Sequence, residues 1–380
     1  MQLINRLFSR IADYIRETDK VLLLLVFAAS SFGCVAVLSA TAYTGSIRQF
    51  LMQVFAMTAG LMLAIFVSGI DYKKLQKYWY IIAAVGLIPV ILTFFIGYAP
   101  EGTDDKAWLL LPGGFSFQPA ELLKICFVIT FSAHLARAGK NVNKLKNLLP
   151  LLAHGACPVL LIHFQGDDGT ALVFAVMLLC MLFVAGLKLR YFVVAALAIA
   201  IASPLAYFFV LNEDQKLRIL SIFTPESNLQ GVGYQQWMGR IALANGGIAG
   251  QGLFNGELTQ SQGVPEGHND FIFVSIGEEL GLLGCVAVLI LLTAICLRCV
   301  RISRLAGDDN GMYIATGIFA MLFAQSVINV GMCTSVLPVI GITLPFFSAG
   351  GSSLLCLMLG IGVLLSVYIH RNSDTIYLHK

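Results

Sequence analysis

The chain of 380 residues is poor in charge, because Asp, Glu, Lys and Arg together make up only 12% of it while hydrophobic residues make up 58%. Its mean hydropathy is +0.83. Soluble globular domains carry about 25% charged residues, so this composition excludes an ordinary water-soluble fold. The sequence also shows no soluble domain, no internal repeat and no glycine loop for nucleotide phosphates. The energy for any reaction must then come from a bound substrate or from a gradient.

Cysteine does not indicate a metal site. All nine cysteines lie in or beside apolar runs, where they are typical small hydrophobic residues: Cys34, Cys126, Cys157, Cys180, Cys285, Cys296, Cys299, Cys333 and Cys356. Cys296 and Cys299 form a single CxxC pair, and no second pair exists to complete a zinc site.

Apolar runs dominate what is present, and ten of them are long enough to cross a bilayer, which takes about 20 residues. They cover residues 21–43, 49–69, 79–98, 119–136, 148–164, 169–187, 191–211, 271–297, 311–334 and 345–369. The sequence therefore predicts an all-α integral membrane protein, with one polytopic domain over residues 1–380 and about ten transmembrane helices.

The Lys and Arg residues predict the orientation, because cytoplasmic loops retain them and translocated loops do not. If the N-terminus is inside, 18 of the 24 lie in cytoplasmic segments and Lys124 lies within a span. The outer segments hold only Arg48, Lys106, Lys216, Arg218 and Arg240. Both termini are thus expected in the cytoplasm, with a large extracytoplasmic loop over 212–270 between the seventh and eighth helices. Residues 1–20 have the pattern of an amphipathic helix on the inner leaflet.

Ionisable residues inside a membrane are costly to keep, so each is a functional candidate. Glu121 and Lys124 lie three residues apart, on one face of a helix that begins near Pro119. They form either a structural ion pair or the charged wall of an outward-facing cavity.

A second cluster of charge lies in the turn at 165–170. Asp168 could cap the helix that begins near Gly169, whereas Asp167 has no such simple role. Upstream of this turn, Trp108 fits an anchor at the membrane interface.

The polar loop ends in the segment 265–273, which carries Glu266, His268 and Asp270 within five residues. One His with scattered carboxylates is an unspecific metal pattern. A carboxylate at a partly desolvated helix entrance can instead accept a proton from a hydroxyl. Glu278 would lie on the same side of the helix, about 12 Å deeper at 1.5 Å per residue, and could equally hold helices together with Glu279.

Farther along, Gln325 and Asn329 share one helical face and could bond between helices or line a cavity. The small residues from Ser348 to Ser353 favour close packing, and a polar head group could use the same side chains.

Several motifs taken together resemble one family, the SEDS proteins (shape, elongation, division and sporulation), which include RodA, FtsW and SpoVE. The resemblance covers nearly the whole chain from the first span onward. The motifs lie at residues 118–124, 169–171, 233–235, 265–273, 277–281 and 345–353. The short segments before the first span and after the last resemble the rod-shape (RodA) members more than the division members.

The resemblance implies an inverting peptidoglycan glycosyltransferase that polymerises lipid II at the outer face of the bacterial cytoplasmic membrane and maintains cell shape. It implies Asp270 as the catalytic residue. Contacts with substrate are expected from Trp108, Glu121, Lys124, Asp167, Arg240, Glu266, His268 and Ser348. The partners implied are lipid II, the growing glycan strand, a class B penicillin-binding protein and membrane lipids, without nucleic acid.

In this chemistry Asp270 would take the proton of the attacking sugar hydroxyl while a cation stabilises the departing pyrophosphate. Lys124, Arg240 or a divalent cation could supply that charge; no cofactor is required by the sequence. Three departures from the family pattern, Ala107, Gly166 and Ala349, affect the details of substrate contact. A flippase for the lipid-linked precursor and a non-catalytic scaffold for a cell-wall synthase are the alternatives.

Overall fold

The computed structural model describes residues 16–99, 105–111, 115–209, 211–224 and 232–372. Ten helices coincide with the ten apolar runs, so the predicted all-α membrane fold is confirmed. They are α2 (Lys20–Ala40), α3 (Arg48–Ser68), α5 (Trp79–Ile96), α6 (Pro119–Ala138), α7 (Leu145–Phe164), α8 (Asp168–Val184), α9 (Leu189–Phe209), α13 (Ile272–Leu305), α14 (Asp309–Cys333) and α15 (Gly351–Ile369). Nine of the described helices are long and apolar enough to cross a membrane, and α8 is a shorter apolar helix of 17 residues.

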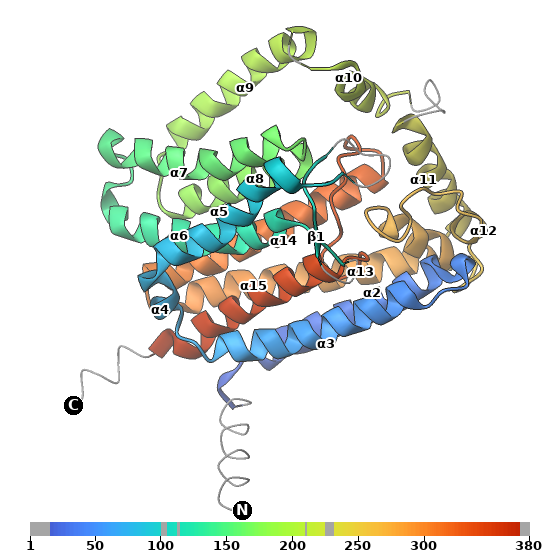
Figure 1. The fold of residues 1–380 in the computed structure, drawn as a ribbon, viewed down its shortest axis with the longest axis horizontal. Coiled ribbons are helices and arrows are strands. Elements are labelled where there is room, and N and C mark those ends of the chain that lie inside the picture. The colour runs from blue at the N-terminus through green and yellow to red at the C-terminus, as the bar shows by residue number, and fades with distance from the viewer. Residues whose placement is uncertain (1–15, 100–104, 112–114, 210, 225–231, 373–380) are drawn as a thin grey trace, which may run out of the picture.

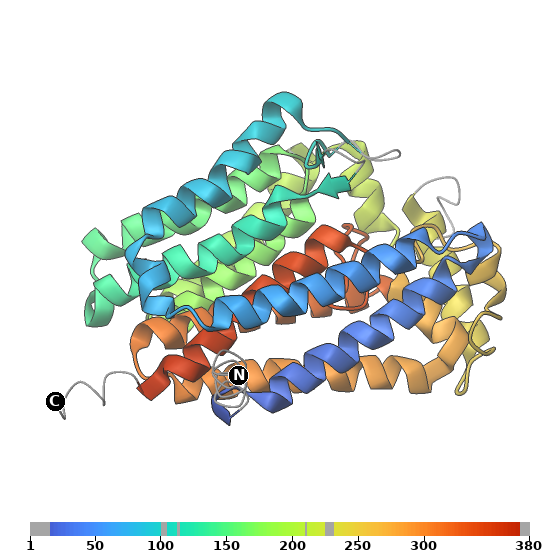
Figure 2. The same ribbon diagram turned by 60° about the horizontal axis from the view of Figure 1, so that its bottom comes forward.

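The bundle is built around α6, α14 and α15, the helices with the largest share of buried residues. Their buried residues are apolar around most of the helix, as expected for a helix surrounded by others. Helix α15 packs against α3, α13 against α14, and α5 against α6. In Figure 1, α9 lies apart from this bundle, and none of its residues is buried. Figure 2 shows α2 running beside α13, against which it packs.

Short elements complete the chain. The helices are η1 (Ala42–Thr44), α4 (Tyr72–Lys77), η2 (Gly139–Asn141), α10 (Glu213–Leu220), α11 (Val232–Gly246), α12 (Glu257–Gln260) and η4 (His370–Asn372). Strands β1 (Leu109–Leu111) and β2 (Phe115–Phe117) form an antiparallel hairpin with Leu110 opposite Ser116. Helices α10 to α12 lie at the opposite end of the bundle from the start of α2 and the end of α15 (Figure 1). The amphipathic helix predicted for residues 1–20 lies mostly outside the described residues.

The last apolar run differs from its prediction at one end. A helix was expected from residue 345, but α15 begins at Gly351 and residues 345–350 form a buried turn. The turn is held locally, because the hydroxyl of Ser348 accepts the Leu344 N–H at 2.7 Å and the Ser348 N–H donates to the Leu344 carbonyl. Phe346, with φ of +70°, takes the left-handed conformation that reverses the chain.

Helix α13 is broken at Gly281, which has φ of 65° and ψ of −162°. The loop between α11 and α12 fills the break. Leu282 donates to the Gly247 carbonyl at 2.9 Å, and in return the Gly252 N–H donates to the carbonyl of Glu279 at 2.9 Å. Backbone groups inside a membrane protein need partners within the protein, so this loop completes the hydrogen bonding that the helix gives up.

We expect Gly281→Ala to lower the free energy of unfolding by about 2 kcal/mol or more. A side chain at this positive φ is strained, and the new Cβ would lie 2.4 Å from the backbone nitrogen of Gly250. Thermal unfolding in detergent measures the loss. Gly69→Ala is the control, because Gly69 has φ of −75° and its Cβ would meet nothing closer than 3.5 Å. Equal stability of both variants would contradict the constraint.

Candidate active site

Asp270 lies two residues before α13, with its main chain fixed and its carboxylate buried. The side-chain amide of Asn329 donates to the Asp270 carbonyl at 2.7 Å and to the Ile342 carbonyl at 2.6 Å. Asp270 is 9% exposed, and its Oδ1 has no hydrogen-bond partner among the described residues. An unpaired buried carboxylate oxygen is costly, so its presence here favours a functional role over a structural one.

Burial, together with the negative charge of Glu266, raises the pKa of Asp270 to about 7 against weaker opposing effects that include the positive charge of Arg218. A general base works best when its pKa lies near the working pH. This carboxyl group can therefore release and accept a proton near neutrality.

A tight turn places Asp270 at one end of the bundle. Glu266 has φ of +54°. Its carbonyl accepts the N–H groups of Asn269 and Phe271 at 3.0 and 3.1 Å. The hydroxyl of Ser275, on α13, donates to the Gly267 carbonyl at 2.7 Å. The turn at 266–270 is thus tied both to itself and to the helix that follows it.

His268 joins this turn to two other segments. The Gln49 side-chain amide donates to Nε2 of His268 at 3.2 Å, and the Ala349 N–H donates to the His268 carbonyl at 2.9 Å. Burial lowers the pKa of His268, and a neutral imidazole is the form that accepts at Nε2.

Gln53, on α3, secures the turn at 345–350 that contacts His268. Its side-chain amide donates to the carbonyl of Ser348 at 2.9 Å and its Oε1 accepts the Gly350 N–H at 3.2 Å. The hydroxyl of Ser348, a predicted substrate contact, accepts a hydrogen bond within this turn.

Glu121 and Lys124 form a buried ion pair. Their side chains meet at 2.7 Å, and the residues are 4% and 1% exposed. Ser353, on α15, donates to the second carboxylate oxygen of Glu121 at 3.2 Å. The interpretation as an ion pair is confirmed, and a substrate contact by either residue stays a prediction.

Asp167 belongs to the same cluster. Its Oδ1 accepts the Thr170 N–H at 2.8 Å and its Oδ2 accepts the Gln118 amide at 2.8 Å. Burial raises its pKa, and the charges of Lys124 and Glu121 reach it with opposite effects.

The predicted cap of α8 was wrong by one residue. Asp167, not Asp168, caps this helix, because Gly166 with φ of +92° turns the chain just before it. Asp168 instead contacts His163 at 2.5 Å and accepts the Gln215 amide at 2.8 Å.

The positive charge of Arg218, on α10, opposes the rise in the pKa of Asp270. Arg218 also donates to the Val339 carbonyl at 3.2 Å. Sequence reasoning missed this role, because nothing local marks Arg218 among the outer basic residues. Arg240, the arginine predicted for the site, donates to the Ile222 carbonyl at 3.1 Å. The carbonyl of Trp108 accepts the Tyr98 N–H beside the hairpin.

Glu278 and Glu279 hold the loop that fills the break in α13. Glu278 is fully buried and accepts the Leu258 and Thr259 N–H groups at 2.9 and 2.7 Å. Glu279 accepts the Ser39 hydroxyl at 2.5 Å and the Gln260 amide at 2.9 Å. Both carboxylates therefore hold segments of the protein together, which is one of the two roles that the sequence allowed.

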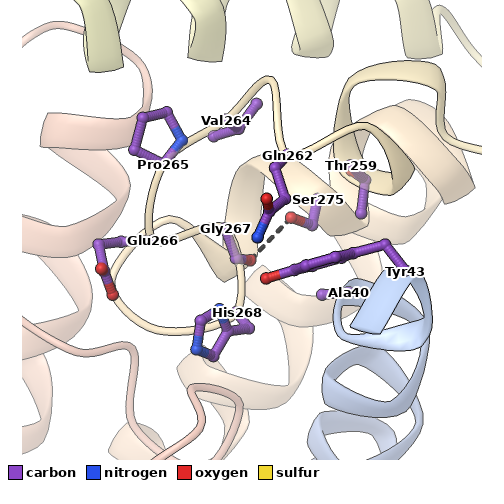
Figure 3. Close-up of a pocket in the computed structure, with 10 residues that line it drawn as sticks. All are labelled: Ala40, Tyr43, Thr259, Gln262, Val264, Pro265, Glu266, Gly267, His268 and Ser275. Carbon is purple, nitrogen blue, oxygen red and sulfur yellow. Dashed lines mark hydrogen bonds between the residues drawn. The ribbon is translucent and has the colours of Figure 1, made fainter. Parts of the chain in front are cut away.

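A pocket of about 280 Å³ opens beside the turn at 266–270. Its lining consists of Ala40, Tyr43, Thr259, Gln262, Val264, Pro265, Glu266, Gly267, His268 and Ser275. Figure 3 shows Tyr43 along one wall, with its hydroxyl directed toward the turn that carries Gly267. Within the described part of the chain no group of three or more His, Cys, Asp or Glu could hold a metal ion.

The fold and the site together define a multi-pass membrane protein with a candidate general base at one end of its bundle. The family model described as "Cell cycle protein", that of FtsW, RodA and SpoVE, matches residues 19–373. The chain therefore belongs to the FtsW/RodA/SpoVE family, and the resemblance seen in the motifs is confirmed.

Individual relatives cover almost the whole chain. The probable peptidoglycan glycosyltransferase FtsW of Geobacter sulfurreducens is 33% identical over 362 residues, which are 93% of this chain and 95% of the relative. The peptidoglycan glycosyltransferase MrdB of Escherichia coli is 32% identical over 356 residues, 93% and 94% of the two chains. Since these two identities are nearly equal, the expected closeness to the rod-shape members stays a prediction.

A solved structure shares the fold. It is described as "Structural coordination of polymerization and crosslinking by a peptidoglycan synthase complex", and one of its chains superposes with a TM-score of 0.82 at 27% identity. The match covers 94% of this chain and 99% of the other.

Breaking the buried ion pair should destabilise the fold. We expect Lys124→Met to cost about 3–5 kcal/mol, because it leaves the Glu121 carboxylate buried without its cation. The double variant Glu121→Gln with Lys124→Met should recover most of that loss. Thermal unfolding in detergent compares the three proteins, and a double variant no more stable than the single one would argue against coupling of the pair.

Proposed function

We propose that this chain polymerises lipid II into glycan strands at the outer face of the cytoplasmic membrane, with Asp270 as the general base. The observation that carries the proposal is a buried carboxylate with a free oxygen and a pKa raised to about 7. The expected enzyme class is confirmed by relatives of nearly full coverage that are named peptidoglycan glycosyltransferases.

The proposed reaction is an inverting transfer. Asp270 accepts the proton of the 4-hydroxyl of the GlcNAc on incoming lipid II while that oxygen attacks the anomeric carbon of the growing strand. The bond from this carbon to the lipid pyrophosphate breaks, and the pyrophosphate leaves with the electron pair. Positive charge near the leaving group stabilises the transition state. Arg218, whose positive charge opposes the rise in the pKa of Asp270, is the proposed source of this charge.

The proposed placement puts α10 to α12 and the turn at 266–270 outside the cell. The Lys and Arg distribution supports it. So does the arrangement of the bundle, in which the start of α2 and the end of α15 lie at the end opposite α10 to α12 (Figure 1). A lipid-linked sugar in the outer leaflet would reach Asp270 from this side.

The proposed partner is a class B penicillin-binding protein that crosslinks the new strand. The similar solved structure is described as a peptidoglycan synthase complex that coordinates polymerisation with crosslinking, which supports a partnership of this kind. We also propose a divalent cation at the outer carboxylates, which would supply further positive charge for the leaving pyrophosphate.

We expect Asp270→Asn to abolish polymerisation of lipid II. An amide cannot accept the hydroxyl proton, and loss of a general base typically costs about 10²- to 10⁴-fold in rate. Purified chain with its partner and labelled lipid II gives the measurement, read as glycan strands on a gel. Thermal unfolding of the same variant confirms that it folds.

Strands formed at the wild-type rate by a folded Asp270→Asn protein would contradict the assignment of the base. Wild-type protein that moves lipid II across vesicles without forming strands would favour a flippase. A chain that is required only for activity of its partner would favour a scaffold.

The pH dependence of the rate tests the electrostatic environment that raises the pKa of Asp270. The carboxylate is the active form, so the rate should rise with pH through about 7. Glu266→Gln removes a negative charge that raises this pKa, and the midpoint should therefore move to lower pH. Initial rates between pH 5 and 8.5 measure the shift. Glu257→Gln, at an exposed carboxylate on α12, is the control and should leave the midpoint in place.

A further inference from the structure

The pocket beside the turn at 266–270 has walls that are fixed before any ligand binds. Thr259 is held by the buried carboxylate of Glu278, which accepts its N–H at 2.7 Å and its hydroxyl at 2.6 Å. Ser275 holds the carbonyl of Gly267, and Gln49 holds the ring of His268. Ligand sites are usually preformed in this way, because a fixed wall lowers the entropy lost on binding.

The charge of the lining selects the kind of ligand. The ten described lining residues include no Lys or Arg, and Glu266 adds a negative charge. Phosphates are bound by cations and by N–H donors, so a lipid pyrophosphate does not suit this pocket. The volume of about 280 Å³ lies just below the range of about 300–1,000 Å³ that is usual for ligand pockets. It suits one small ring rather than a lipid tail or a peptide.

The polar groups of the lining suit a sugar ring. The Tyr43 ring offers a flat apolar surface of the kind that buries a large area on contact, and its hydroxyl points into the same space as the Gln262 side chain (Figure 3). The amide of Gln262 and the hydroxyl of Tyr43 both donate and accept hydrogen bonds. Hydroxyl groups on a sugar need such partners, and the C–H face of the sugar can lie against the aromatic ring.

We infer that the pocket formed by Tyr43, Gln262 and the Glu266–His268 turn is a subsite for one uncharged hexosamine ring of the glycan strand, away from the lipid pyrophosphate. The inference rests on the proposed function, since it names a substrate contact of the same reaction. The turn that lines the pocket also carries Asp270, so a sugar held in the pocket lies on the same rigid unit as the base. Binding of a sugar ring in this pocket is expected to retain the strand between successive transfers.

Binding of a soluble tetramer of N-acetylglucosamine to the full-length protein in detergent tests the subsite. We expect saturable binding to the wild type, about tenfold weaker binding to Tyr43→Ala, and near wild-type binding to Tyr43→Phe, which keeps the ring. Gln262→Ala should also weaken binding. Ser261→Ala is the matched control, because Ser261 is exposed and adjacent but does not line the pocket.

Strand length gives a second readout. With its partner present, Tyr43→Ala should release strands several-fold shorter than those of the wild type when the two proteins are compared at equal total consumption of lipid II. Unchanged tetramer binding together with unchanged strand length in Tyr43→Ala would overturn the subsite. Loss of co-purification with the partner, with sugar binding intact, would also overturn it and would identify the pocket as a protein contact.

Asp270→Asn separates this inference from the proposed function. The variant should form no strands yet bind the tetramer as the wild type does. If Asp270→Asn is inactive while Tyr43→Ala behaves as wild type in both assays, the proposed function stands and the subsite fails. If the wild type forms no strands but binds the tetramer through Tyr43, the subsite stands as a sugar site and the proposed polymerase fails.

Discussion

In a bilayer the backbone of a helix has no water to replace a lost hydrogen bond, so a helix can be interrupted only where other protein groups take over. Helix α13 is interrupted at Gly281, and the loop from Gly247 to Gly252 takes over. Two buried carboxylates, Glu278 and Glu279, then fasten the chain just beyond this loop. These hydrogen bonds also fix one wall of the pocket beside the turn that carries Asp270, because Thr259 donates to Glu278 and lines the pocket.

The ionisable groups near this end of the bundle differ in whether their side chains have partners. Glu121 neutralises Lys124 at 2.7 Å, and Glu278 and Asp167 are satisfied by backbone N–H groups. Asp270 differs, because only its main-chain carbonyl is secured and one carboxylate oxygen has no partner among the described residues. A group held in place by its backbone while its side chain stays unsatisfied is suited to exchange protons with a substrate.

The helices and the place of Asp270 at the entrance of α13 could be predicted from the sequence because their signals are local. Apolar runs of about 20 residues mark the spans, and the segment 265–273 marks the entrance of α13. The break at Gly281 could not be predicted, since it depends on a loop about thirty residues earlier approaching the helix. Arg218 was missed for the same reason, and the last span was begun too early because buried Phe346 and Phe347 are as apolar in a turn as in a helix.

The length of α8 determines how deep in the membrane its cap residue, Asp167, lies. Its 17 residues span about 26 Å at 1.5 Å per residue, less than the hydrocarbon thickness of about 30 Å. The cap residue Asp167 therefore lies below the level at which longer helices leave the membrane if the inner ends are aligned. Gln118 donates to Asp167 at 2.8 Å, and the ion pair of Glu121 and Lys124 lies in the same cluster. These polar groups therefore lie within the hydrocarbon thickness, where they satisfy one another because bulk water is absent.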